Sequence, residues 1–498
     1  MKIQNIIPGF CMLISCMMIP VDIHMGLSYD DVLLVPKKSP VSSRTGVTLK
    51  TKLTRNIELN MPIVSANMDT VTESKMAIAM AQLGGIGIIH RFNTIEQQVE
   101  EVRRVKRARN AIIEHPFTIQ DTQTIAQALD EMHAHEITSL LIVNDNKQLV
   151  GIITSRDTRF CTDIQRPVTA IMTPIDRMVL GKSTITIEEA KDVLCMYKLE
   201  KLPLIHEEEG TIAGLITYKD IVTKTQFPMA AVDKKDRYLV GAAIGVKDDA
   251  IERARALVEA GADVLVIDIA HGDCDAEIAM IKDIKALFPD VDIIAGNVAT
   301  AQGTKRLIEA GADAVKVGIG PGSICTTRIT TGAGYPQLSA IINCAEVAKQ
   351  YGVPVIADGG ICYSGDLTKA IGAGASTVML GSLLAGTEES PGTAFIKGGR
   401  KYKVIRGMAS LGAALGRNAK TQGSGAHDTF VPEGVEGTVP YRGKLSEIVY
   451  QLLGGLRSGL TYCGCSSLYE LIGNGSFVQI TAAGVRESHP HDIQEAVR

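Results

Sequence analysis

A cysteine in a glycine-rich loop is the residue of this chain best suited to do chemistry. Residues 318–328 read Gly-Ile-Gly-Pro-Gly-Ser-Ile-Cys-Thr-Thr-Arg, and the cysteine is Cys325. The mostly apolar residues 314–317 predict a short strand before this loop. The loop therefore lies at the carboxyl end of a strand, where α/β enzymes place their active sites. Glycine amides in such a turn can stabilise a thiolate, so we predict that Cys325 is a covalent nucleophile.

The alternative for a lone cysteine is a small, buried apolar residue. We assign that role to Cys195 and Cys344, because both lie on apolar faces of predicted helices. Cys325 differs from them because glycines, Ser323 and two threonines surround it. Carbonyl oxygens of the same loop could also hold a monovalent cation.

Two further strand ends carry residues that suit a phosphate. Asp358-Gly359-Gly360 and Gly381-Ser382 follow two successive predicted strands. Glycine amides and a serine hydroxyl at these places match the phosphate cradle that late barrel strands form. The alternative is a pair of ordinary turns between strand and helix. With Ser323 as a third donor, the pattern favours a phosphorylated ligand.

Two acidic residues have alternative roles that the sequence leaves open. Asp268 ends another predicted strand, where it could accept from ribose hydroxyls or cap the next helix. Glu433 lies in the glycine-rich segment 421–443, which we expect to form a mobile loop over the site. It is either a general base or a surface charge.

A recurring unit predicts the elements that position these residues. From about residue 237 to 386, an amphipathic helix leads through Gly-Ala-Asp or a similar turn to an apolar strand and a glycine-bearing loop. This alternation means a parallel sheet covered by helices, and its many repeats predict a (β/α)₈ barrel. An open doubly wound sheet is the alternative, but no GxGxxG motif opens a helix. The predicted strands span residues 62–65, 86–89, 264–267, 292–295, 314–317, 354–357 and 377–380.

A different segment, residues 116–222, interrupts the barrel pattern and repeats internally. Residues 151–157 read Gly-Ile-Ile-Thr-Ser-Arg-Asp and recur at 214–220 as Gly-Leu-Ile-Thr-Tyr-Lys-Asp. Two copies of about 60 residues, each helix–strand–strand–helix, predict an inserted pseudo-symmetric module. We therefore divide the chain into an extension (1–24), a first barrel part (25–115), this module and a second barrel part (223–498) with a flap at about 409–443.

Composition excludes several classes of protein. The 498 residues carry 51 basic and 55 acidic side chains without basic clusters, which argues against nucleic-acid binding. Ten cysteines without a CxxC pair indicate reduced thiols, so we expect a cytoplasmic protein. The apolar run within residues 1–24 is too short for a comfortable membrane span. We expect that extension to be disordered or to result from assignment of an upstream start codon.

Longer motifs resemble the inosine monophosphate (IMP) dehydrogenase and guanosine monophosphate (GMP) reductase family. The resemblance runs from Leu27 to about Ile493, nearly the whole chain. It implies a TIM barrel enzyme of purine nucleotide metabolism. The motifs that carry it are Tyr29-Asp30-Asp31-Val32-Leu33-Leu34-Val35-Pro36, Met68-Asp69-Thr70-Val71-Thr72-Glu73, the cysteine loop through Gly334-Tyr335-Pro336-Gln337, Asp358-Gly359-Gly360 and Glu433-Gly434-Val435.

The resemblance implies a reaction and roles for the residues. Cys325 would attack C2 of the IMP purine, hydride would pass to NAD, and water would hydrolyse the thioimidate to xanthosine monophosphate. Thr327 and Glu433 would help to activate that water. The implied substrate-binding residues are Asn67, Met68, Ser323, Asp358, Gly359, Gly360, Gly381, Ser382, Gly407, Met408 and Glu433.

It also implies ligands other than the substrate. The nicotinamide nucleotide would contact Asp268, Asn297, Gly318, Ile319 and Gly320. A potassium ion would sit on carbonyls of Gly320, Gly322 and Cys325, completed by Glu487, Ser488 and His489 from a neighbouring subunit of a homotetramer. The repeated insert looks like a pair of CBS modules, which in this family bind adenine or guanine nucleotides.

Some residues depart from the dehydrogenase pattern. Dehydrogenases carry an Arg-Tyr pair in the flap, where the arginine activates water, but residues 417–421 read Arg-Asn-Ala-Lys-Thr. Ile405 stands where a tyrosine is expected, and Ala66-Asn67-Met68 and Thr461-Tyr462 resemble the reductases. Leu411 and His90-Arg91-Phe92 resemble the dehydrogenases instead. Our first hypothesis is an NAD-dependent IMP dehydrogenase, the second a CBS-bearing GMP reductase using NADPH, and the third a non-catalytic nucleotide sensor.

Overall fold

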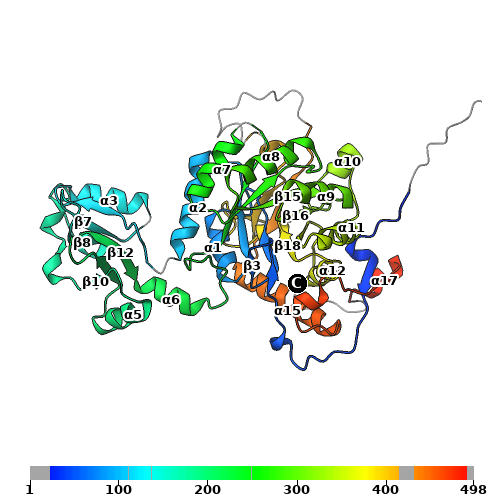
Figure 1. Ribbon diagram of the computed structural model, residues 1–498, viewed down its shortest axis with the longest axis horizontal. Coiled ribbons are helices and arrows are strands. Elements are labelled where there is room, and N and C mark those ends of the chain that lie inside the picture. Colours follow the sequence, from blue (N-terminus) through cyan, green and yellow to red (C-terminus); the bar gives the residue numbers. More distant parts are fainter. Residues whose placement is uncertain are drawn as a thin grey trace, which may run out of the picture.

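The body of the molecule is a closed parallel barrel wrapped by helices (Figure 1). The computed structural model describes residues 23–109, 112–135, 137–247, 249–413, 415 and 431–490. Within these residues, eight parallel strands pair in the order β13-β14-β15-β16-β17-β18-β4-β5, and β5 pairs with β13 to close the ring. The predicted (β/α)₈ barrel is confirmed, and the open doubly wound alternative is wrong.

The barrel strands are short, and seven of them follow the predicted segments closely, whereas β13 was not predicted. They are β4 (Ile63–Ser65), β5 (Ile86–Ile89), β13 (Val240–Ile244), β14 (Val264–Asp268), β15 (Asp292–Val298), β16 (Ala314–Val317), β17 (Val355–Asp358) and β18 (Thr377–Leu380). Strand β15 is longer than predicted and carries Asn297 to the carboxyl rim. The polar residues near its end hid that extension in the sequence.

Helices cover the outside of the strands. They include α1 (Ser74–Gln82), α2 (Ile95–Ala108), α7 (Ala250–Glu259), α8 (Asp275–Leu287), α9 (Ala301–Ala310), α11 (Gln337–Gln350), α12 (Ser364–Gly372), α13 (Ser382–Ala385) and α15 (Leu445–Tyr462). Along β14, Val264 and Val266 point into the barrel, whereas Leu265 and Ile267 pack with the helix-side core. Because both faces are buried, the strand reads as a continuous apolar run.

A hairpin closes the amino-terminal end of the barrel. Strands β2 (Thr51–Lys52) and β3 (Glu58–Leu59) pair antiparallel. Leu53 and Leu59 pack into the apolar interior of the barrel, and the Arg55 amide donates to the Asp313 carbonyl just before β16. The hairpin thus covers the amino-terminal end, and the carboxyl end of the barrel stays open to ligands, as in other barrels of this type.

The internally repeated segment forms two small sheets beside the barrel, at the left of Figure 1. One contains β6 (Thr118–Gln120), β7 (Ser139–Val143), β8 (Leu149–Thr154) and β9 (Thr173–Pro174), with α3 (Ile125–Ala134) and α4 (Ser155–Thr158). The other contains β10 (Gly181–Lys182), β11 (Lys201–Ile205) and β12 (Ile212–Thr217), with α5 (Ile187–Met196) and α6 (Tyr218–Gln226). Each sheet has its own apolar cluster. The domain boundaries assigned from the sequence stay predictions.

Some expectations were wrong or fall outside the described residues. Cys344 is buried as predicted, but Cys195 is exposed on α5, so its assignment to an apolar core was wrong. The predicted loop 421–443 contains strand β21 (Glu436–Pro440), whose mostly exposed residues give no apolar alternation. Residues 416–430 of the flap, residues 1–22 of the extension and residues 491–498 lie outside the described residues.

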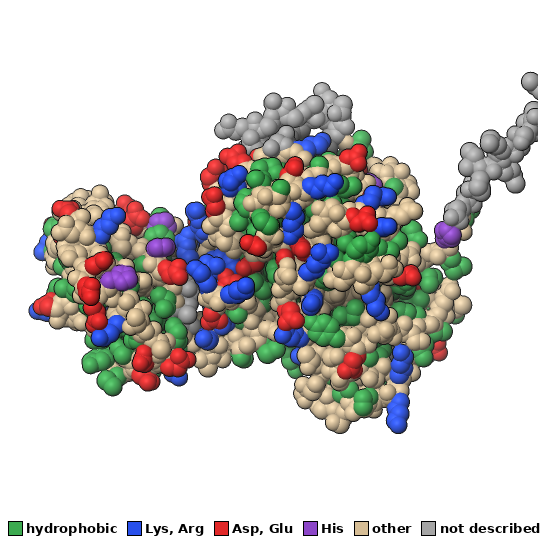
Figure 2. Space-filling view, viewed as in Figure 1, with side chains coloured by type: hydrophobic (Ala, Val, Ile, Leu, Met, Phe, Trp, Pro, Cys, Tyr) green, Lys and Arg blue, Asp and Glu red, His purple; other side chains and the backbone are tan. Residues whose placement is uncertain are grey.

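The surface mixes charges of both signs. On the face shown in Figure 2, basic and acidic side chains are interspersed over the barrel and the inserted segment. No helix among the described residues is long and apolar enough to cross a membrane.

A small sheet flanks the flap and is held by a buried lysine. Strands β19 (Phe395–Lys397), β20 (Arg400–Arg406) and β21 pair antiparallel. Lys403 on β20 is buried, and its ammonium donates to the Thr387 carbonyl at 2.9 Å, to the Ser390 carbonyl at 2.7 Å and to Ser390 Oγ at 3.1 Å. This cage ties the flap strands to the segment that follows α13.

We predict that Lys403→Met lowers the free energy of unfolding by about 2 kcal/mol, because the caged acceptors lose their donor inside the protein. Urea denaturation followed by circular dichroism measures this change. Lys397→Met, at an exposed position of β19 in the same sheet, is the matched control and should change the free energy by less than about 0.5 kcal/mol. Equal stability of the two variants would contradict the cage.

Candidate functional site

One cavity of about 400 Å³ lies at the carboxyl end of the barrel, where the sequence predicted the chemistry. It brings together residues that are far apart in the chain, from positions 66 to 434. Of the predicted residues, those that line it are Asn67, Met68, Asp268, Asn297, Gly318, Ile319, Gly320, Gly322, Cys325, Thr327, Asp358, Gly407, Met408 and Glu433. Catalytic, substrate and cofactor candidates therefore share one space.

A chain of hydrogen bonds joins the cysteine to an acid. Cys325 Sγ donates to Thr327 Oγ1 at 3.1 Å, and Thr327 Oγ1 donates to Glu433 Oε2 at 2.8 Å. The sequence left Glu433 as either a base or a surface charge, and this geometry places it in the site. Proton transfer along such a chain needs only short rotations of hydroxyl and thiol.

Backbone pairing fixes the acid beside the cysteine loop. The Thr326 amide donates to the Glu433 carbonyl at 2.9 Å, and the Val435 amide donates to the Ile324 carbonyl at 3.0 Å. Cys325 and Gly434 form an antiparallel bridge. Hydrogen bonds therefore join the end of the flap to the loop that carries the nucleophile, although Thr327 and Glu433 are 106 residues apart in the sequence.

The cysteine loop can turn only because Gly318 has no side chain. Its φ is +153°, and a Cβ built there would lie 2.0 Å from the backbone oxygen of Asp358. Arg328 secures the far side of the loop, where its guanidinium donates to the carbonyls of Ile319 at 3.3 Å and Tyr335 at 2.5 Å. The ends of β16 and β17 thus approach closely under the cavity.

A buried lysine joins the strand ends that form the floor. Lys316 on β16 is 2% exposed, and its ammonium lies 3.0 Å from Asp358 Oδ2 and 3.8 Å from Asp268 Oδ1, and also donates to Asn297 Oδ1. Asn297 in turn donates to Asp358 Oδ2 at 2.9 Å. Burial lowers the pKa of Lys316, but the Asp358 and Asp268 carboxylates outweigh burial and raise it, so the side chain carries a positive charge.

Sequence reasoning missed Lys316 and a second buried group, Glu277 on α8. The signal for Lys316 is a single charge inside the apolar run Ala-Val-Lys-Val, which a fully buried strand does not tolerate without partners. Glu277 gave no such signal, because an acid in the first turn of an amphipathic helix is ordinary. The alternative that Asp268 caps the next helix is wrong, since Cys274 is the N-cap of α8.

The predicted phosphate residues lie beside this cavity rather than on its wall. Ser323, Gly359, Gly360, Gly381 and Ser382 are not among the lining residues. A Cβ on Gly359 would meet Pro321 at 2.8 Å, and one on Gly381 would meet Met68 Sδ at 3.0 Å. These glycines therefore pack directly against residues of the cysteine loop and of the cavity.

The residues predicted for potassium fall into two places. Gly320, Gly322 and Cys325 share the cysteine loop, and the Gly322 carbonyl accepts from the Cys325 amide at 3.1 Å. Glu487, at the end of α17 (Ala482–Glu487), and the following Ser488 and His489 lie elsewhere. His489 lines a separate cavity with Pro321, Gly360 and Tyr363. That a neighbouring subunit supplies these three residues stays a prediction.

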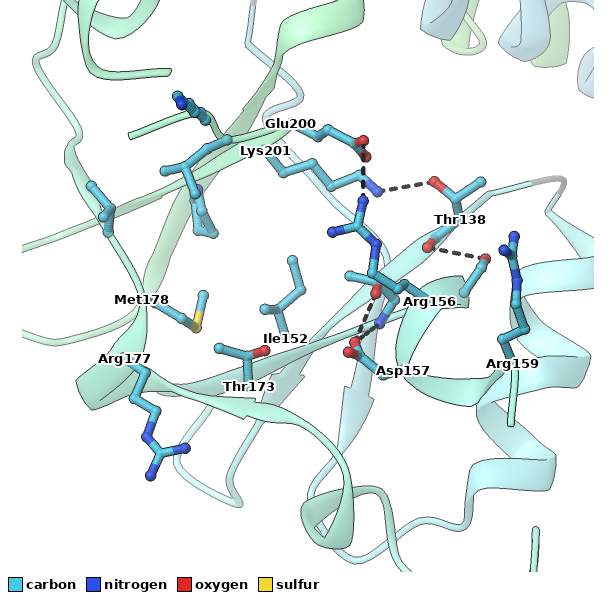
Figure 3. Close-up of a pocket in the computed structure, with 16 residues that line it drawn as sticks. Thr138, Ile152, Arg156, Asp157, Arg159, Thr173, Arg177, Met178, Glu200 and Lys201 are labelled. Atoms are coloured by element: carbon cyan, nitrogen blue, oxygen red, sulfur yellow. Dashed lines mark hydrogen bonds and ion pairs between the residues drawn. The ribbon is translucent and has the colours of Figure 1, made fainter. Parts of the chain in front are cut away.

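A second cleft, of about 530 Å³, lies between the two halves of the inserted segment (Figure 3). Lys201 from β11 donates to Thr138 Oγ1 at 2.9 Å across the cleft, and Arg156 forms an ion pair with Glu200 at 3.6 Å. Asp157 accepts from the amide and hydroxyl of Thr154. Its further lining residues include the cations Arg159, Arg177 and Lys198. Such a basic cleft suits an anionic ligand.

Comparisons with known proteins agree on the family. The family model described as "IMP dehydrogenase / GMP reductase domain" matches residues 26–491. The chain is 52% identical to inosine-5'-monophosphate dehydrogenase of Nitrosopumilus maritimus, over 94% of this chain and 98% of that one. It is 50% identical to GMP reductase of Leishmania major, over 94% and 97%. Most of the similar curated proteins carry the dehydrogenase name.

A solved structure matches over nearly the full length. It is a variant of GMP reductase from Trypanosoma brucei in complex with guanosine 5'-monophosphate, with a TM-score of 0.89 and 47% identity. The alignment covers 95% of this chain and 99% of that one. The fold and the sequence therefore point to one family whose members carry two enzyme names.

We predict that Gly318→Ala lowers the free energy of unfolding by roughly 2–4 kcal/mol, because the new Cβ collides with the backbone of Asp358. Gly352→Ala is the control, since Gly352 also has a positive φ (+63°) but open space around it. It should cost about 1 kcal/mol from backbone strain alone. Urea denaturation of both variants measures the difference, and equal losses would refute a steric role for Gly318.

Proposed function

Because the chain belongs to the IMP dehydrogenase / GMP reductase family, we propose that it oxidises IMP to xanthosine monophosphate with NAD through a bond from Cys325 to C2 of the purine. The observation that carries the proposal is the chain from Cys325 through Thr327 to Glu433 in a cavity at the carboxyl end of the barrel. A nucleophile, a relay hydroxyl and an acceptor carboxylate are what covalent purine oxidation requires.

The proposed reaction has two halves that use the same residues. In the first, the Cys325 thiol loses its proton along the Thr327 hydroxyl to Glu433, and the sulfur bonds to C2 of IMP. Bound NAD would supply the acceptor for the hydride that leaves C2, and a thioimidate would remain on Cys325. In the second, Glu433 first releases that proton to solvent. Water then adds to C2 as Glu433 accepts a proton from it through Thr327, the C–S bond breaks, and the sulfur takes this proton back along the same chain as xanthosine monophosphate leaves.

Other residues around the cavity would bind and orient the two nucleotides. Asp358 would accept from the ribose hydroxyls of IMP, and Gly407 and Met408 would border its base, while Ser323, Gly359, Gly360, Gly381 and Ser382 would hold the phosphate. On the other side, Asp268, Asn297 and residues 318–320 would face the dinucleotide. The shared floor of Lys316, Asn297 and Asp358 supports this layout, because it fixes both rims relative to each other.

We further propose that a potassium ion supports the cysteine loop. The carbonyls of Gly320, Gly322 and Cys325 lie in one turn, and carbonyl oxygens are ligands that hard cations accept. The ion would fix the loop conformation rather than take part in bond changes. Glu487, Ser488 and His489 of a neighbouring subunit would complete its ligand set, which ties the site to a homotetramer.

A second candidate is a GMP reductase, and particular observations favour it. Residues 417–421 lack the Arg-Tyr pair of the dehydrogenases, and the matched structure from Trypanosoma brucei is named GMP reductase. In that reaction Cys325 would displace ammonia from C2 of GMP. Hydride supplied by NADPH would then add to C2 of the thioimidate, and the C–S bond would break to give IMP and the free cysteine. The same cysteine and relay would serve, with the proton moving towards the departing ammonia.

We predict that absorbance at 340 nm rises when the protein meets IMP and NAD, because reduced nicotinamide forms. A fall with GMP and NADPH instead would overturn the dehydrogenase and support the reductase. No change in either mixture, with purine nucleotides still bound, would favour a non-catalytic sensor.

We predict that Cys325→Ala lowers the rate of whichever reaction is observed by at least about 10³-fold, since the variant lacks the nucleophile. Cys195→Ala, an exposed cysteine on α5, is the control and should keep full activity.

We also propose that the cleft between the repeated halves is a CBS-type site for adenine or guanine nucleotides. Its cations Arg156, Lys198 and Lys201 supply charge for phosphates, and Asp157 offers a carboxylate for ribose. Burial lowers the pKa of Lys201, although Glu200 opposes that shift. A phosphate at hydrogen-bond distance would stabilise the charged amine, so binding and ionisation would support each other.

We predict that Lys201→Met weakens binding of ATP or GTP to this cleft about tenfold, since a charge-assisted contact to phosphate is lost. Isothermal titration calorimetry of the full chain measures the affinity. Lys182→Met is the matched control, because Lys182 is an exposed lysine on the adjacent strand β10 and pairs with Glu207 at 3.0 Å. Equal affinities for wild type and Lys201→Met would reject Lys201 as a nucleotide contact.

A further inference from the structure

A carboxyl group without an assigned role lies sealed behind one side of the cavity. Glu277, in the first turn of α8, is fully buried. Its Oε1 accepts from the Gly296 amide at 2.6 Å, and its Oε2 has no hydrogen-bond partner among the described residues. A Cβ on Gly272 would lie 2.5 Å from Oε2, so this oxygen packs against the loop after β14. No bulk water separates the carboxyl group from that loop.

The two segments that enclose Glu277 also line the cavity. The end of β14 and the loop after it supply residues 268–270, and the end of β15 supplies Asn297. The two are joined by a hydrogen bond from the Gly272 amide to the Asn297 carbonyl at 2.7 Å. Under the proposed function, these segments face the dinucleotide. A charge on Glu277 would therefore act on that ligand across one layer of backbone.

The charges that act directly on Glu277 come from two strands. Lys316 on β16 attracts an ionised Glu277, and Asp268 at the end of β14 repels it. The Lys316 ammonium is already shared by Asp358 on β17, by Asn297 and by Asp268. Further out, Arg91 lies 3.9 Å from Asp268, and Asp273 in the loop itself is paired with Arg306. No cation is thus dedicated to Glu277.

Burial raises the pKa of Glu277 to about 8, although the Gly296 amide and Lys316 oppose the shift and Asp268 adds to it. A pKa near 8 places the change of charge of this carboxyl group in the neutral to mildly alkaline range. Both states are accessible over the range in which the protein can be studied.

We propose that Glu277 is a positioning residue that makes dinucleotide binding depend on the redox state of the nicotinamide and on pH. The inference rests on the proposed function, because it needs a nicotinamide nucleotide at this side of the cavity. The oxidised ring carries a positive charge and the reduced ring is neutral. An ionised Glu277 in a low-dielectric interior stabilises the cation and leaves the neutral ring unaffected. By linkage, binding of the oxidised form releases the Glu277 proton to solvent.

The test compares affinities of the full chain for NAD and NADH at pH 7 and pH 9 by isothermal titration calorimetry. In the wild type, the ratio of the NAD dissociation constant to the NADH dissociation constant should fall about tenfold between these pH values. In Glu277→Gln, which keeps an acceptor for the Gly296 amide but cannot ionise, the ratio should stay constant. Asp275→Asn is the control, since Asp275 lies exposed in the same turn of α8 and the pH effect should persist.

Different results would overturn the proposed function or only the role of Glu277. Failure of both dinucleotides to bind at either pH would overturn the proposed function and the inference together. Binding with an unchanged ratio in the wild type, or a ratio that still falls tenfold in Glu277→Gln, would overturn the inference alone. If Glu277→Gln does not fold, NAD titrations of the wild type at pH 8 in buffers of different ionisation enthalpy replace it. Absence of proton release in those titrations would also reject the role of Glu277.

Discussion

The site depends on one buried ammonium, that of Lys316. A charge taken out of water is tolerated only where partners surround it, and here Asp358, Asn297 and Asp268 supply them from three neighbouring strands. The partners are also the polar groups that reach the cavity. Removal of the Lys316 ammonium would leave the Asp358 and Asp268 carboxylates without their shared cation. The stability of the barrel rim and the chemistry of the rim are therefore set by the same contacts.

The cysteine loop rests on this rim and receives its acid from far away in the chain. Gly318 lets β16 run within van der Waals distance of the Asp358 backbone, and the loop then turns back beneath the end of the flap. There, two backbone hydrogen bonds hold Glu433 beside Thr327. The Lys403 cage anchors β20, which precedes the flap and pairs with β21 within it. The flap can thus vary in sequence while the relay keeps its geometry.

The sequence predicts those features that depend on local pattern. Buried parallel strands are continuous apolar runs, so β14, β16 and β18 were found nearly to the residue, and the glycine loop identified Cys325. Features that depend on distant neighbours escaped. Lys316 and Glu277 acquire their roles only when the barrel closes, and β21 has exposed residues that resemble a loop. Cys195 was misplaced because its helix packs against a small sheet that leaves that face open.

The described core of the site is equally suited to both reactions of the family. Cys325, Thr327 and Glu433 can pass a proton from an attacking water or to a departing ammonia, because a relay of hydrogen bonds works in either direction. The choice must therefore lie in groups that distinguish the two nucleophiles or the two redox states. In the dehydrogenases, flap residues select water as the nucleophile. A carboxyl group such as Glu277, which favours cationic over neutral nicotinamide only when ionised, would distinguish the two redox states of the cofactor. On this view pH changes the balance of the reaction through the cofactor, while the purine chemistry stays the same.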